Sequence, residues 1–257
     1  YLYGDITHQL MTTIGATDTR SIKLDKFSIS DYKLDFGLQY TYKLNKKNTI
    51  NIGAVYTLGR TLHGDAYKYH QTGAESNGSI YVQSQTGDTI PNPFKMPHTF
   101  GIGLTYVYDN RLTIGVDYTL QKWNTADLAW SKFNKESVEM NSRTKIAFGA
   151  EFVPSYISHN YLKRIRYRMG AYYSSPYNKV SYTSPDTGTT SFQDGAREYG
   201  VSIGFGLPMF QSKSMLNISG QYIKVSPKFK GLMEENYLRI NIGLTFNERW
   251  FMKWKVD

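Results

Sequence analysis

Residues 32–43 read YKLDFGLQYTYK, and this stretch decides the fold class. Every second residue is apolar or aromatic, and the residues between them are charged, polar or glycine. Successive side chains of a β-strand point to opposite faces, so a period of two predicts a strand with one apolar face. That face holds Tyr32, Leu34, Phe36, Leu38, Tyr40 and Tyr42, and the other holds Lys33, Asp35, Gly37, Gln39, Thr41 and Lys43.

The same alternation recurs in eight further segments, at residues 49–58, 99–108, 112–121, 145–152, 164–173, 198–207, 216–222 and 238–246. Most apolar faces extend over about nine to eleven residues, the length that a tilted strand needs to cross a bilayer. Strands of a soluble β-sandwich, the alternative, are usually about five or six residues long. The chain also has 22 Tyr, many near strand ends, as an interfacial aromatic girdle requires. We therefore predict an all-β fold, a transmembrane antiparallel up-and-down β-barrel formed as a single domain over residues 1–257.

Residues 1–14 alternate more weakly and are predicted to form a tenth strand. The connections after successive strands are alternately short and long, which is typical of periplasmic turns and extracellular loops. On this scheme the last strand leaves the C-terminus in the periplasm of a bacterial outer membrane. Residues 15–27 and 59–97 are long loops, and residues 66–84 within the second are either an extracellular hairpin, which we favour, or two further barrel strands.

Composition and motifs exclude several functions. The chain has no Cys, so disulfides and thiol chemistry are absent. The net charge of +9 comes from basic residues scattered over loops, turns and the polar strand faces, which argues against nucleic-acid binding. No catalytic motif is present, so we predict neither an enzyme nor a cofactor. His63, His70, Asp65 and Glu75 match no metal-site spacing, and His98 has no partner that would make it a general base.

Three segments resemble the FadL-type outer-membrane transporters of long-chain fatty acids and hydrophobic compounds. They are KMPHTFGIGL at residues 95–104, YDNRLTIG at 108–115 and INIGLTF at 240–246. The resemblance implies a fourteen-stranded barrel with an N-terminal hatch, of which this chain would supply ten strands, the C-terminal two-thirds. Residues 247–257 continue beyond the closing aromatic Phe246, which departs from the common C-terminal assembly signal.

The candidate ligand residues lie on the polar faces, which line the lumen. Arg164, Arg166 and Arg168 form an inward ladder, because a guanidinium facing lipid would cost about 2–4 kcal/mol. Two interpretations stay open for the ladder. It binds an anionic head group by bidentate contacts, or it is neutralised by lumen carboxylates, with Glu151 pairing Arg166. The candidate set is Arg164, Arg166, Arg168, Glu151, Lys33, Asp117 and Arg239. The lumen-facing glycines 101, 103, 200, 204 and 206 are interpreted as curvature positions in preference to space for a plug.

Two functions follow from these observations. The first, implied by the resemblance, is passive uptake of hydrophobic or amphipathic small molecules, with a fatty-acid-like ligand. The second is a FadL-fold barrel that does not transport and that docks other outer-membrane proteins or lipoproteins in a secretion or assembly complex. Membrane lipids surround the barrel in either case.

Overall fold

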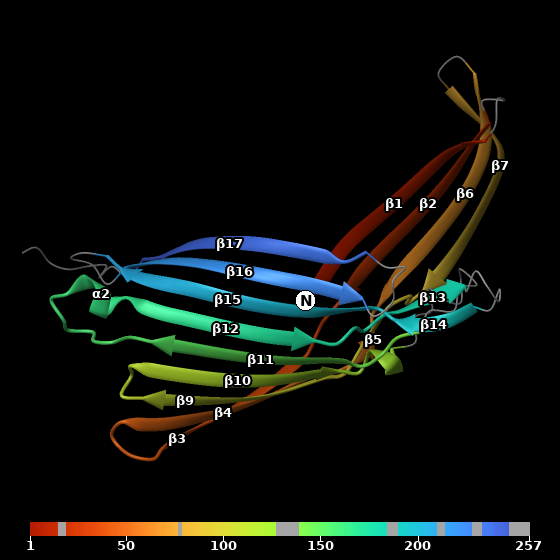
Figure 1. Cartoon of the computed structure of the whole chain (residues 1–257). Coiled ribbons are helices and arrows are strands. Elements are labelled where there is room, and N and C mark those ends of the chain that lie inside the picture. The colour runs from red at the N-terminus through yellow and green to blue at the C-terminus, as the bar shows by residue number, and fades with distance from the viewer. Residues whose placement is uncertain are drawn as a thin grey trace, which may run out of the picture. The chain divides into compact units, whose positions relative to one another are not determined.

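The computed structural model describes residues 1–14, 19–76, 79–126, 139–183, 190–209, 214–227 and 233–246. These residues divide into two compact units. One unit comprises Tyr1–Phe36, Thr57–Thr99 and Lys122–Met140, and the other comprises Gly37–Tyr56, Phe100–Gln121 and Asn141–Asp257. Figure 1 labels their strands.

The second unit is built on a nine-stranded antiparallel sheet, which we call the barrel sheet (Figure 1). Its strands are β3 (Asp35–Lys43), β4 (Asn48–Thr57), β9 (Thr99–Tyr108), β10 (Leu112–Gln121), β11 (Arg143–Phe152), β12 (Arg166–Ser174), β15 (Ala196–Pro208), β16 (Met215–Pro227) and β17 (Glu235–Thr245). Their spatial order from β3 to β17 follows the chain, as an up-and-down meander requires. The predicted all-β, antiparallel barrel-type fold is confirmed. No pairing of β3 with β17 closes the sheet within the described residues.

Short connections join several neighbouring strands of the barrel sheet. Asp109 and Asn110 have φ angles of 49° and 53°, and Arg111 N–H donates to the carbonyl of Tyr108 at 2.8 Å. Positive φ at both central residues is the two-residue turn whose twist matches paired strands. The connection between β11 and β12 is longer, at residues 153–165, and holds the short helix α2 (Tyr161–Arg164).

The first unit contains a four-stranded antiparallel sheet in the order β1-β2-β6-β7. These strands are β1 (Leu2–Ile14), β2 (Thr19–Asp31), β6 (Gly64–Ser76) and β7 (Ser79–Pro91), each 13 residues long. The hairpin favoured for residues 66–84 is therefore present, as β6 and β7. Two predictions are wrong. Residues 1–14 pair with β2 and are not a tenth barrel strand, and most of residues 15–27 are strand rather than loop.

The remaining elements are small. They are the pair β5 (Arg60–Thr61) and β8 (Lys95–Met96), the pair β13 (Lys179–Thr183) and β14 (Thr190–Asp194), and the 3-10 helix η1 (Trp123–Thr125). None of the described helices is long and apolar enough to cross a bilayer. The single predicted domain thus corresponds to two separate sheets.

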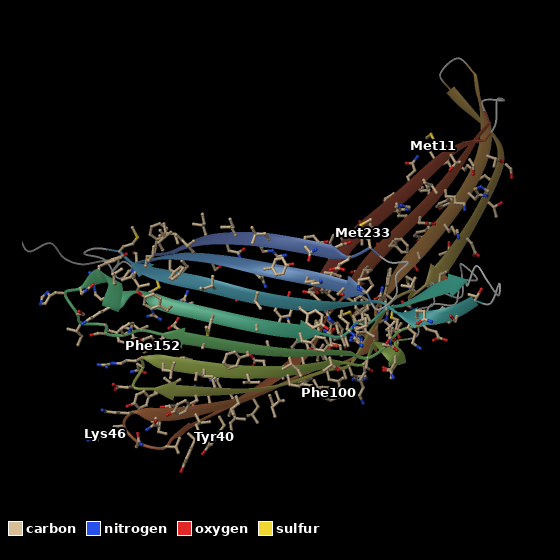
Figure 2. All side chains as sticks on the ribbon, in the orientation of Figure 1. Met11, Tyr40, Lys46, Phe100, Phe152 and Met233 are labelled. Carbon is tan, nitrogen blue, oxygen red and sulfur yellow. The ribbon has the colours of Figure 1, made fainter. Side chains whose placement is uncertain are left out.

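The apolar faces of the strands are exposed and do not form a packed core. Ile102, Ile203 and Ile242 are 58%, 60% and 72% exposed, and Leu34, just before β3, is 40% exposed, so the soluble-sandwich alternative is wrong. Figure 2 shows side chains of the barrel sheet, among them Tyr40 and Phe152. A sheet that leaves so many large apolar side chains uncovered on one face is typical of a wall that faces lipid.

Candidate functional site

The polar face of the barrel sheet carries a cluster of two arginines and one carboxylate, which we call the Glu151 cluster. Arg166 Nη1 lies 3.0 Å from one oxygen of Glu151, and Arg168 Nε lies 2.7 Å from the other. Arg168 Nη1 also donates to Asn217 Oδ1 at 2.7 Å. The side chains of Glu151, Arg166 and Arg168 are 25%, 34% and 37% exposed, so the cluster is partly screened by solvent. Both arginines are therefore ion-paired within the wall, and the single carboxylate leaves the cluster with one net positive charge.

The register of the strands explains this geometry. Glu151 on β11 stands directly opposite Arg168 on β12, and Arg166 lies one step along the same face. A single carboxylate with two oxygens accepts from both guanidiniums because it lies between them. The sequence predicted Glu151 as the partner of Arg166 and left open whether the ladder binds an anionic head group or is neutralised. In the structure Glu151 pairs with Arg168 as well as with Arg166.

Arg164 is not part of the ladder. It is the last residue of α2, outside the strand, because the side chain of Asn160 accepts from Leu162 N–H at 3.0 Å and so begins a helical turn. The guanidinium lies 5.6 Å from the ring centre of Tyr161, and its Nε is buried without a hydrogen-bond partner. The predicted three-arginine ladder on one lumen face is corrected to two arginines.

A second polar cluster lies further along β12, and sequence reasoning missed most of it. Tyr172 donates to Glu198, and Arg143 Nη2 lies 3.8 Å from the same carboxylate. Arg143 Nε donates to Ser174 Oγ at 2.8 Å, and Lys145 lies 4.7 Å from the centre of the Tyr172 ring. Arg143 has the inward parity of β11, so the alternation of the sequence could have predicted it as a lumen residue.

The lumen-facing glycines make room for these side chains. A Cβ on Gly200 would lie 2.0 Å from the ring of Tyr172, and one on Gly206 would lie 3.1 Å from Cβ of Arg166. The side chains of β12 therefore cross the bare backbone of β15, and Arg168 reaches Asn217 on β16 in the same way. Close packing against a neighbouring strand explains these positions, where the sequence interpretation was sheet curvature.

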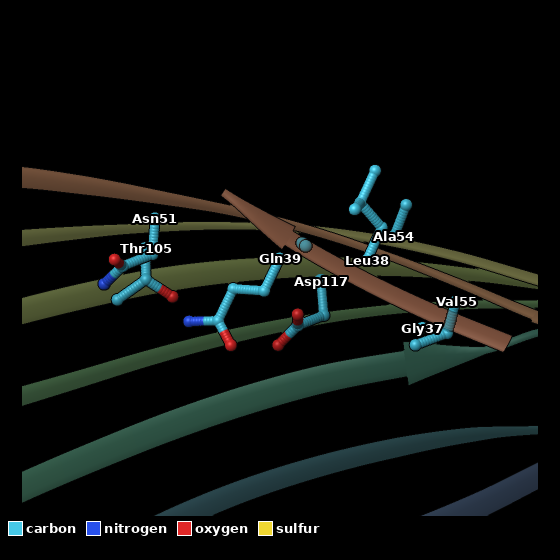
Figure 3. Close-up of a pocket in the computed structure, with 10 residues that line it drawn as sticks. Gly37, Leu38, Gln39, Asn51, Ala54, Val55, Thr105 and Asp117 are labelled. Atoms are coloured by element: carbon cyan, nitrogen blue, oxygen red, sulfur yellow. The ribbon is translucent and has the colours of Figure 1, made fainter. Parts of the chain in front are cut away.

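A shallow groove of about 420 Å³ lies on β3, β4, β9 and β10 (Figure 3). Gln39, Asn51, Thr105 and Asp117 point to one side of the sheet, and Leu38 and Ala54 point to the other. The floor contains Gly37, Gly53 and Gly103, and a Cβ on Gly103 would lie 2.4 Å from Oδ1 of Asp117. The groove offers carboxylate and amide groups over a glycine floor, which suits hydrogen bonding to a small polar group.

The other predicted residues are not brought together. Lys33 lies between β2 and β3 and forms an ion pair of 2.9 Å with Asp35. Arg239 is exposed on β17 opposite Gln221. His70 contacts Ser21 Oγ at 2.9 Å, and the Glu75 side chain lies outside the described side chains. Among the residues whose positions are described, no group of acidic and histidine side chains could hold a metal ion.

The first unit contains one buried carboxylate that sequence reasoning missed. Asp31, 4% exposed, accepts from the backbone N–H of His63 at 2.8 Å and of Tyr32 at 2.7 Å. Arg60 Nη2 lies 3.5 Å from Asp31, and its guanidinium lies 4.1 Å from the centre of the Tyr32 ring. The bonds from His63 and Tyr32, with Arg60 adding to them, hold the pKa of Asp31 at about 2. Asp31 therefore fixes the end of β2 to the segment that leads into β6.

The fold and the site define a class of protein: a β-barrel wall with an apolar outer face and ion-paired polar groups on its inner face. The sequence model of the BamG family matches residues 1–257, and the chain belongs to the BamG family. Among solved structures, the CymD monoaromatic hydrocarbon channel is similar, with 11% identity, a TM-score of 0.44 and coverage of 87% of this chain and 74% of that chain. No curated protein matches. The barrel-type fold that the FadL-type resemblance implies is present. The other features that the resemblance implies remain predictions.

Proposed function

We propose that this chain is an outer-membrane subunit of a protein-assembly complex, in which the barrel sheet anchors the chain and the four-stranded sheet docks a protein partner. Membership of the BamG family supports association with other outer-membrane assembly proteins. The apolar outer face supports a bacterial outer-membrane location, because only lipid covers such a face without a second protein layer.

The observation that carries the proposal is the edge of the four-stranded sheet. Strand β1 is an edge strand of 13 residues, and Ile6, Leu10 and Met11 on it are 62%, 50% and 46% exposed. Ile6 and Leu10 lie on one face and Met11 lies on the other, so β1 exposes apolar side chains on both of its faces. A long edge strand with exposed apolar side chains is a template for pairing with a strand of another protein. Conduction through a barrel needs no such sheet.

The Glu151 cluster argues in the same direction. An amphipathic anion would have to compete with Glu151 and Asn217 for the guanidinium groups of Arg166 and Arg168. Guanidiniums that are already paired support a structural role in the barrel wall, which is one of the two interpretations that the sequence left open.

The test is site-specific photo-crosslinking in native membranes, with a photoreactive residue at Ile6 or Leu10. The control position is Lys46, exposed in the turn between β3 and β4 (Figure 2). We expect one discrete outer-membrane partner from both β1 positions and not from Lys46. Replacement of residues 64–91 by a short Gly-Ser turn should abolish the product while the barrel remains folded. Absence of any product at β1, in a chain that purifies alone, would overturn the proposal.

Uptake of a small polar or amphipathic molecule is the second candidate, and the groove over Gly37, Gly53 and Gly103 favours it. Liposome flux distinguishes the two functions. Flux that Asp117→Asn and Gln39→Ala reduce would support uptake, and its absence in a folded barrel would exclude it.

A further inference from the structure

The outer face of the barrel sheet contains a groove of about 270 Å³ that neither proposed function uses. Its lining includes Leu112, Ala150, Phe152, Tyr167, Met169 and Phe205. These six residues come from β10, β11, β12 and β15 and have the parity opposite to the Glu151 cluster, whereas Arg168 and Gly204, which also line the groove, have the inward parity. The groove therefore opens on the lipid side of the wall.

The registers show how the groove forms. Leu112, Phe152, Tyr167 and Phe205 are opposite one another in successive strands and form a row across the sheet. The next row holds Ile114, Ala150, Met169 and Ile203, in which the small side chain of Ala150 leaves a depression. Tyr167 and Phe205 meet edge to face, with ring centres 6.0 Å apart, which fixes one wall of the groove.

A basic turn is joined directly to this groove. The hydroxyl of Tyr167 donates to the carbonyl of Leu162 in α2 at 3.0 Å, and Lys163 and Arg164 follow Leu162. Val153 N–H donates to the carbonyl of Arg111 at 2.7 Å, which holds the turn of Asp109, Asn110 and Arg111 next to Leu112. Arg111 lies 3.6 Å from Asp109, whereas Lys163 and Arg164 pair with no carboxylate of a described residue.

Lys163 and Arg164 place two positive charges in this turn. The Nε of Arg164 is buried and has no hydrogen-bond partner among the described residues, so the described part of the chain does not compensate this guanidinium there. An anionic group beside the turn would offset the charges of Lys163 and Arg164.

From this geometry we infer that the groove and the α2 turn form a binding site for one anionic phospholipid. An acyl chain lies along Ala150 between Phe152 and Met169, and the phosphate is held by Lys163 and Arg164. The apolar surface of the groove favours binding of the acyl chain. The positive charges of Lys163 and Arg164 at the end of the groove favour a negatively charged head group. A free phosphate would leave the groove empty, so the occupant is a lipid.

The test is native mass spectrometry of the purified full chain, titrated in detergent with phosphatidylglycerol or phosphatidylcholine of equal chain length. Ala150→Phe fills the groove, and the double variant Lys163→Gln with Arg164→Gln removes the charge. Ala171→Phe is the matched control for bulk, because Ala171 has the same outward parity on β12 but does not line the groove. Lys46→Gln is the control for charge at another turn.

We expect the unmodified chain to retain one phosphatidylglycerol about tenfold more tightly than phosphatidylcholine. Ala150→Phe should reduce the binding of both lipids about tenfold. The double variant should abolish only the preference for phosphatidylglycerol, and both controls should behave like the unmodified chain. Glycerol phosphate should not compete.

Equal retention of the two lipids by the unmodified chain would overturn the inference. Equal losses in Ala150→Phe and Ala171→Phe would also overturn it, because they would show a general lipid shell. The double variant lies in a turn, so it keeps the inference testable if Ala150→Phe does not fold.

Discussion

Arg168 donates from Nε to a carboxylate oxygen of Glu151 at 2.7 Å, and the two residues stand directly opposite each other on β12 and β11. Cross-strand pairs of opposite charge stabilise a sheet, and here the pair also shares its carboxylate with Arg166. One carboxylate therefore contacts two cations on the inner wall and offsets one of the two charges, which makes Glu151 the most sensitive member of the cluster.

Replacement of Glu151 by Gln should destabilise the barrel by about 1–2 kcal/mol. Loss of one partner from a fully buried ion pair costs about 3–5 kcal/mol, and partial exposure of this cluster reduces the effect. The measurement is urea unfolding of the chain refolded in detergent. Arg166→Gln should cost less, because Glu151 keeps its bond to Arg168. If both variants unfold at the same urea concentration as the unmodified chain, the cluster makes no net contribution.

The barrel strands were predictable because their pattern is local. Each strand of the barrel sheet has one apolar face exposed to the surroundings, so the period of two is visible without knowledge of its neighbours. Strand β2 was missed because its apolar residues change parity, from Ile22 and Leu24 to Phe27 and Ile29. Only its pairing with β1 and β6 shows that it is a strand.

The candidate site was predictable only in part, for the same reason. Arg164, Arg166 and Arg168 alternate like strand residues, yet the cap at Asn160 places the first of them in α2. The contact of Arg168 with Asn217 depends on the positions of three strands and on the glycines of β15, which a single sequence does not give. The buried position of Asp31 likewise results from residues more than 25 positions away along the chain.

Asp31 should make the attachment of β2 depend on pH. The pKa of the Asp31 carboxyl is about 2 in the folded chain, whereas an ordinary Asp has a pKa of 3.8. The ionised carboxylate therefore stabilises the folded state fully above pH 3.8, and this stabilisation is lost as the pH falls toward 2. Hydrogen exchange of the His63 amide, corrected for the intrinsic rate, should therefore be slow at pH 6 and faster at pH 2. Asp31→Asn should exchange fast at both values. Asp88→Asn, at an exposed position on β7, is the control and should follow the unmodified chain. Equal protection of the unmodified chain at pH 6 and pH 2 would contradict this account.

Gly200 should not tolerate a side chain, because the ring of Tyr172 occupies the position that a Cβ on Gly200 would take. We expect Gly200→Ala to cost about 1–3 kcal/mol, the usual effect of overpacking. Gly149→Ala is the control on the same face, since its added Cβ would meet no atom within 4 Å. Addition of Tyr172→Ser to Gly200→Ala should restore part of the loss in urea unfolding. A loss of equal size in both alanine variants would show that backbone freedom, and not the ring, decides the effect.

Adjacent residues in the middle of β9 should respond in opposite ways to the same substitution, because they face different surroundings. Leu104 is 51% exposed on the apolar face, and Thr105 lines the groove beside Asp117 on the polar face. A lysine on the lipid side costs about 2–4 kcal/mol near the bilayer midplane, whereas a lysine on the lumen side keeps its water and finds a carboxylate. Leu104→Lys should therefore lower the stability of the barrel folded in lipid vesicles by about 2–4 kcal/mol. Thr105→Lys should change this stability by less than about 1 kcal/mol. Both variants carry the same added charge and differ by one position, so general effects of charge on refolding cancel. Equal losses in the two variants, or a larger loss at Thr105, would mean that the apolar face of the barrel sheet is not the face that contacts lipid.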